Sequence, residues 1–138
     1  MSYKCPLCKK NGSLVISHSI ELPAAAYVSP DTDELSLQVV ACDACGFRGA
    51  AVYKESRRGA GEAWHHYCFA VATDAVSTLA ALIDSCPARA DRDCSCAAHA
   101  TIGRCDRERR WTPPIPVDAP NTFPMRLARG APWWRLWR

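Results

Sequence analysis

Two pairs of cysteines with the same short spacing constrain this chain more than any other feature. Cys5 and Cys8 form one CxxC turn, and Cys42 and Cys45 form a second, so the full pattern is C-x2-C-x33-C-x2-C. Each turn places two sulfurs close enough to bind the same ion, and four thiolates in a tetrahedron suit zinc. Gly46, directly after the second turn, permits a positive φ there. The doubled pattern predicts a structural zinc site. The alternatives are a redox pair, which needs no second copy, or free thiols.

The nine cysteines indicate the same chemistry when the rest of the sequence is considered. The first ten residues are polar and charged, without the apolar stretch of a secretory signal, and no run of 18 apolar residues follows. We therefore expect a cytoplasmic protein with no transmembrane segment. In that compartment thiols stay reduced, so the cysteines are expected to be metal ligands rather than disulfide partners.

The residues around the CxxC turns alternate between apolar and polar, as half-buried strands do. After them, Thr73 or Asp74 is expected to cap a helix that runs to about Ser85 with one apolar stripe. These elements predict an α+β fold, namely a small antiparallel zinc ribbon with one packed helix. In such a ribbon the metal locks strands that are too few to form a core alone. The expected strands are Gly12–Ile20, Leu35–Ala41, Phe47–Lys54 and Trp64–Val71.

The CxxC spacing, the proline in the first turn and the run Cys42-Asp43-Ala44-Cys45-Gly46-Phe47-Arg48 resemble the zinc ribbon of the ZPR-type zinc-finger family. The likeness covers residues 5 to about 55. It implies a protein that binds partner proteins, notably a translation elongation factor, rather than a catalyst. The family's Asn-Asn-Glu after the second turn is replaced here by Gly49-Ala50-Ala51. The motif residues that match are Cys5, Cys8, Cys42, Cys45 and Gly46.

A second group of soft ligands lies between residues 86 and 105. Its segment contains few apolar side chains, so something other than a core has to order it. We expect a second structural zinc, with Cys105 as the first replacement if one ligand is wrong; the alternative is a loop with incidental thiols. The expected ligands are Cys86, Cys94, Cys96 and His99.

No motif indicates an enzyme. His65 and His66 precede Cys68 closely enough to suggest a catalytic dyad, but neither an oxyanion motif nor a third orienting residue can be identified. The zinc-deaminase pattern and glycine-rich phosphate loops are also missing. We expect the two histidines to flank a buried aromatic strand, with one of them as a zinc ligand as the alternative.

The C-terminal part of the sequence differs from the rest. Residues 1–103 have a net charge of −2, whereas residues 104–138 have +5, all of it from arginine. Five of the ten prolines lie within residues 113–124, which predicts an extended tether. We expect one domain over residues 1–112 and a tether and tail over 113–138. The residues expected to bind a partner are Arg126, Arg129, Arg135, Arg138, Trp133, Trp134 and Trp137.

These features favour a non-enzymatic zinc-binding adaptor, an accessory protein that docks on a partner protein or complex. Tryptophan and arginine commonly dominate protein interfaces. The same residues also suit single-stranded nucleic acid, which makes a nucleic-acid-binding zinc-ribbon module the first alternative. The second alternative is an accessory subunit at an anionic membrane surface. The tail could also fold back onto its own domain.

Overall fold

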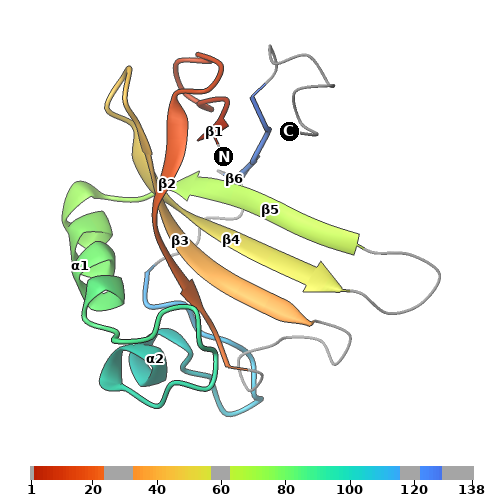
Figure 1. The fold of residues 1–138 in the computed structure, drawn as a ribbon, viewed down its shortest axis with the longest axis vertical. Helices are drawn as coiled ribbons and strands as arrows, with labels where there is room; N and C mark the ends of the chain where they lie inside the picture. Colours follow the sequence, from red (N-terminus) through yellow and green to blue (C-terminus); the bar gives the residue numbers. More distant parts are fainter. Residues whose placement is uncertain (1, 24–32, 57–62, 116–121, 129–138) are drawn as a thin grey trace.

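The computed structural model describes residues 2–23, 33–56, 63–115 and 122–128. Their framework is one antiparallel sheet of six strands, in which every strand pairs with its neighbours in sequence (Figure 1). The two helices lie on the same side of this sheet. The strands are β1 (Ser2–Tyr3), β2 (Leu14–Glu21), β3 (Glu34–Cys42), β4 (Arg48–Ser56), β5 (Ala63–Ala70) and β6 (Thr122–Pro124), and the helices are α1 (Thr73–Asp84) and α2 (Ala97–Ile102).

The expected α+β zinc ribbon is wrong, because the fold is mostly antiparallel β with only small helices. The strands β2 to β5 are eight or nine residues long and form a continuous meander, not a short ribbon held together by a metal. Long strands with alternating apolar residues bury a full sheet face. Among the described residues many apolar side chains are almost completely buried, including Phe69, Leu37 and Ile83. The metal sites therefore add to a core that the sheet already has.

The sheet is curled, so that its first and last strands meet. Tyr3 forms a bridge with Leu127, just after β6. The backbone N–H of Lys4 donates to the carbonyl of Arg126 at 2.8 Å, and that of Ala128 donates to Ser2 at 3.1 Å. Residues 122–128 therefore belong to the sheet. Ile115, within the segment expected to be a tether, is also buried in the core.

Alternation along the strands divides the buried residues between the two faces of the sheet. Leu35, Leu37 and Val39 of β3 lie in the cluster with α1 and α2. Val40 and Cys42 belong to a second cluster, which also contains Tyr3. The same alternation places Phe69 of β5 in the first cluster and Cys68 in the second, as its sequence predicts.

Helix α1 occupies the predicted segment and buries the predicted stripe, which consists of Val76, Leu79, Ala80 and Ile83. The helix begins without the expected cap, because Ala72 is the N-cap residue and no side chain bonds there. Asp74 instead accepts a hydrogen bond from the N–H of Ala75 inside the first turn. The segment after α1 then crosses toward β2 and leads into α2 (Figure 1).

Candidate metal centres

The first centre gathers the four cysteines of the two CxxC turns, whose Sγ atoms all lie within 4.8 Å of one another. The Sγ atoms of Cys5 and Cys45 are 3.7 Å apart, and those of Cys8 and Cys42 are 3.8 Å apart. A tetrahedron with metal–sulfur bonds of about 2.3 Å has edges of about 3.8 Å, whereas a disulfide brings its sulfurs to about 2.05 Å. The cluster therefore has the dimensions of a four-thiolate metal site.

The two CxxC turns have the same backbone conformation. In the first, the N–H of Lys9 donates to the carbonyl of Cys5 at 3.1 Å; in the second, the N–H of Gly46 donates to Cys42 at 3.2 Å. The residue after each turn has a positive φ, 67° at Lys9 and 79° at Gly46. The glycine after the second turn was the sequence signal for this geometry. The equivalent strain at Lys9 carried no signal.

Backbone N–H groups point at the sulfurs of this centre. The N–H groups of Ala44 and Cys45 lie 3.3 and 3.4 Å from Sγ of Cys42, and that of Leu7 lies 3.4 Å from Sγ of Cys5. Such bonds stabilise thiolates, the form that binds metal. They give the first centre a ready set of donors for negative sulfur.

The four thiols affect one another's charge. Burial raises the pKa of Cys42, but hydrogen bonds with Ser13 and with backbone N–H groups outweigh burial and lower it to about 6. The N–H of Phe47 lowers the pKa of Cys45, but burial and the three neighbouring thiols outweigh it and raise it to about 12. One thiolate therefore opposes the ionisation of the next. A metal cation bound among the sulfurs would offset this repulsion between thiolates.

The second centre consists of the four ligands expected from the sequence, Cys86, Cys94, Cys96 and His99, whose ligand atoms also lie within 4.8 Å of one another. Sγ of Cys86 is 3.9 Å from Sγ of Cys94. Nδ1 of His99 is 3.1 Å from Sγ of Cys86 and 3.4 Å from Sγ of Cys96. In a tetrahedral site the edge between a nitrogen and a sulfur ligand is about 3.5 Å, so this group also has metal-site dimensions.

His99 is buried and oriented by β2. Its Nε2 lies 2.9 Å from the carbonyl oxygen of Glu21. A carbonyl only accepts, so Nε2 carries the proton and the lone pair of Nδ1 points toward the sulfurs. Metal-bound histidines usually make such a bond with their second nitrogen. The bond also joins the segment around α2 to the sheet.

The local fold explains how the cysteines of this centre are presented. Cys96 is the N-cap residue of α2, and its sulfur accepts from the N–H of His99 at 3.4 Å. This bond is the main cause that lowers the pKa of Cys96 to about 6. Burial is the main cause that raises the pKa of Cys86 to about 11. As in the first centre, a thiol with a lowered pKa lies beside a thiol with a raised pKa.

The other candidate residues lie apart from these two groups. Cys105 is not among the four ligands of the second centre and bridges to Trp111. His66 bonds through Nε2 to Oε1 of Gln38 at 2.8 Å, and burial lowers its pKa. His65 is exposed, and Cys68 is buried in the cluster with Tyr3. Neither histidine belongs to a metal-ligand group, and the three residues make no contact typical of a dyad in the described chain.

Of the residues expected to bind a partner, only Arg126 is described, and it is exposed. Its carbonyl accepts from the N–H of Lys4, directly after β1, so its backbone lies beside the first centre. The remaining predictions for the tail lie outside the described residues. They concern Arg129, Arg135, Arg138, Trp133, Trp134 and Trp137.

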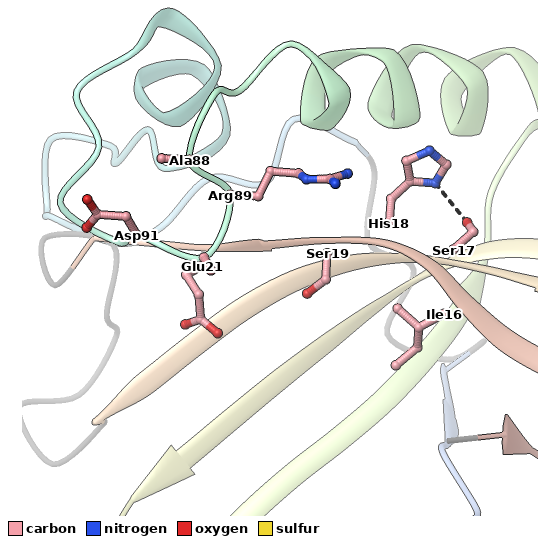
Figure 2. A pocket seen from close by; sticks show the side chains of 9 residues that line it. Ile16, Ser17, His18, Ser19, Glu21, Ala88, Arg89 and Asp91 are labelled. Carbon is pink, nitrogen blue, oxygen red and sulfur yellow. Dashed lines mark hydrogen bonds between the residues drawn. The ribbon is translucent and has the colours of Figure 1, made fainter.

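A polar groove of about 750 Å³ runs along β2 and was not expected from the sequence. Figure 2 shows Ser17, His18 and Glu21 on β2, with Arg89 and Asp91 on the segment after α1. Oγ of Ser17 is 2.8 Å from Nδ1 of His18, and Nε2 of His18 is 3.2 Å from Oδ2 of Asp84.

This chain of polar groups gave no signal in the sequence, because Asp84 lies 66 residues from His18. Ser17 is exposed and lies at a bulge in β2, which turns its side chain into the groove. Its hydroxyl also lies 3.3 Å from the carbonyl of Val39. The contacts therefore join the end of α1 to β2 at an exposed surface.

Three glutamates form a second group that the sequence did not indicate, since they belong to different strands. Glu34 has its pKa raised to about 7, first by burial and then by Glu21 and Glu55. Oε1 of Glu21 accepts from Ser36 at 3.0 Å, and Oε2 of Glu55 accepts from Tyr53 at 2.8 Å. Hydrogen bonds among the three glutamates, and from the hydroxyls of Ser36 and Tyr53, reduce the repulsion between their carboxylates.

Comparison of the chain with protein-family models, with curated proteins and with solved structures returned no match. The resemblance to the ZPR-type ribbon therefore stays a prediction. None of the helices in the described ranges is long and apolar enough to cross a membrane. The two groups of cysteine and histidine are sites that could bind metal ions, and their ligand sets are compatible with zinc.

Proposed function

We propose that this chain is a non-enzymatic zinc-binding adaptor in which both metals are structural. One observation supports this above all: each centre is closed by four protein ligands. Catalytic zinc keeps three protein ligands and leaves the fourth position for water or substrate. Four sulfurs, or three sulfurs and one imidazole, at the spacing of a tetrahedron leave no such position.

The positions of the ligands explain what the metals would do. The first centre joins the turn after β1 to the turn between β3 and β4, and the second joins the end of α1 to α2. Zinc preference follows from the soft ligands and the tetrahedral shape. In this account the metals shape surfaces, and function resides in what those surfaces bind.

The groove along β2 is the described surface that best suits a protein partner. β1 pairs only with Leu14 and Val15, and the N–H of Glu21 donates to the carbonyl of Arg89 at 2.9 Å. Between these points the outer edge of β2 has no ladder partner in the described ranges. An extended segment of another protein can add to such an edge. The tail, with its tryptophans and arginines, would be the second contact.

The closed sites can be tested by replacing zinc with Co²⁺ and recording the visible spectrum. We expect tetrahedral bands for two sites, and we expect azide or imidazole to leave them unchanged because no coordination position is open. A spectral change on adding either ligand would contradict the structural role.

The adaptor role can be tested by recovering partners from lysate with the full chain and with variants. Ser19 lies two residues before Glu21 on β2, so its N–H, like that of Glu21, points away from β3 toward the outer edge of the strand. Ser19→Pro removes this donor, whereas Ser19→Ala keeps it and serves as the matched control. We expect the same proteins to be lost with Ser19→Pro or after truncation before residue 129, and kept with Ser19→Ala. Recovery that survives both changes would refute this docking mode.

Nucleic-acid binding is a second candidate because of one observation: a cavity beside the first centre is lined by three cations and no acid. The membrane-surface role has no comparable support among the described residues and stays a prediction.

A further inference from the structure

A cavity of about 290 Å³ lies next to the first metal centre, between the first CxxC turn and the segment around β6. Cys5 forms part of its wall, so the cavity adjoins the metal ligands directly. Its other lining residues are three cations, one aromatic ring and two prolines, namely Lys4, Lys9, Arg126, Phe123, Pro6 and Pro124.

The fold brings two lysines beside the first CxxC turn together with an arginine from the segment after β6. The N–H of Lys4 donates to the carbonyl of Arg126, which fixes β1 beside the segment after β6. Lys9 is placed by the CxxC turn, where its backbone adopts a φ of 67°. A positive φ is unfavourable for a residue other than glycine. The sequence thus keeps a lysine where glycine would be easier.

The charges in this cavity are not balanced by acids. Among the described residues none of the three cations forms an ion pair, and no carboxylate lines the cavity. A zinc ion with four thiolates has a net charge of −2, which would offset two of the three cations. One positive charge then remains, beside an open volume that an anion can enter.

We propose that this cavity binds one nucleotide of a single-stranded nucleic acid. Lys4, Lys9 and Arg126 would contact its phosphate, and the ring of Phe123 would stack on its base. The volume is at the lower end of ligand sites, which suits one nucleotide. This inference rests on the nucleic-acid candidate and not on the adaptor role.

The test measures binding of a fluorescent ten-nucleotide uridine RNA by anisotropy at several salt concentrations, with the full zinc-loaded chain. For single strands, each phosphate contact contributes about 0.7 to the slope of log K against log salt. Lys4→Gln and Arg126→Gln should each weaken binding, and together they should reduce the slope by about that amount because they share one phosphate. Arg107→Gln removes the same charge at an exposed position outside the cavity and should leave the slope unchanged. Phe123→Leu should weaken binding about tenfold and keep the slope.

Two further measurements keep the result decisive. The zinc content of each variant is counted by native mass spectrometry, and Lys9→Gln replaces any variant that loses zinc. Uridine monophosphate is added as competitor to separate a free nucleotide from a strand. Weaker binding by the cavity variants with unchanged zinc content supports the proposal. Absent RNA binding, slopes unaltered in the cavity variants, or binding of the monophosphate without the RNA would overturn it. So would lowered zinc affinity with RNA binding intact, because the cations would then serve the metal alone.

Discussion

The matched CxxC turns allow one prediction to be worked out from the backbone. Lys9 and Gly46 occupy equivalent positions with φ of 67° and 79°, and their N–H groups make the same hydrogen bond. A Cβ at Gly46 would meet nothing within 4 Å. The cost of Gly46→Ala is therefore the cost of the backbone conformation alone, without any clash.

The magnitude follows from two opposing terms. A left-handed conformation costs an L-residue about 1–2 kcal/mol. Replacing glycine by alanine also removes freedom from the unfolded chain, which returns about 0.4–1 kcal/mol. We expect Gly46→Ala to lower the free energy of unfolding by about 1 kcal/mol. Lys9→Gly should reverse both terms and raise it by up to about the same amount, and the double variant should resemble the wild type.

The assay is urea unfolding at a fixed excess of zinc, with Lys9→Gln as the control that removes the charge and keeps the backbone strain. We expect this control to match the wild type. A neutral Gly46→Ala, or a Lys9→Gly that destabilises the protein, would refute the equivalence of the two turns. A loss of several kcal/mol in Gly46→Ala would show a clash where the structure has open space.

Three other changes test separate parts of the structure. Gly49→Ala would place its Cβ against the carbonyl oxygen of Phe69, so β4 and β5 would have to separate. We expect the free energy of unfolding in urea to fall by about 3 kcal/mol. A fall no larger than that of Gly46→Ala would contradict this packing. Glu34 has a pKa raised from 4.5 to about 7, so its contribution to stability is present below pH 4.5 and is lost as the pH rises through 7. Glu34→Gln should therefore flatten the pH dependence of stability in this range, whereas the exposed Glu108→Gln should not. Identical profiles for Glu34→Gln and the wild type would refute the shift. Cys105→Ser should keep two zinc ions per chain whereas His99→Ala should keep one, as counted by native mass spectrometry; a zinc lost from Cys105→Ser would place Cys105 in the second centre.

Spacing and periodicity were sufficient to predict which cysteine and histidine side chains come together, and where most of the main elements lie. Each CxxC turn fixes two sulfurs locally, so pairing the turns left little choice at the first centre. The alternation of Leu35, Leu37 and Val39 and the stripe of α1 correspond to real burial, because these periods follow directly from strand and helix geometry. For the second centre, ligand density in a segment without apolar support was the signal.

The predicted fold class was wrong because the fold depends on pairing between strands that are far apart in the sequence. Strands β1 and β6 have two and three residues, too few to show any period, and they are specified by their neighbours rather than by their own sequence. The prolines near residue 124 suggested a tether, yet Pro124 lies at an edge strand, where no N–H is needed. Likewise the six residues of α2 follow from the cap at Cys96 and from the position of His99, not from a pattern.

In the first centre, too, the sequence was sufficient to predict only part of the site. The sequence identified Cys5, Cys8, Cys42 and Cys45, and the N–H groups near the sulfurs belong to the same two turns. It did not show that Arg126 approaches this centre, because that contact depends on the closing of the sheet, which no local pattern encodes. The polar groove along β2 was missed for the same reason, since Asp84 and His18 meet only in the folded chain.

The most direct test of the central claim is the native mass of the full chain purified with zinc supplied. Two closed centres predict two zinc ions per chain, one of which is lost in Cys42→Ser and the other in His99→Ala. Loss of the first should also lower the free energy of unfolding, because binding in such sites is worth on the order of 10–16 kcal/mol. A wild-type mass with fewer than two zinc ions, or an unchanged count in Cys42→Ser, would contradict the account.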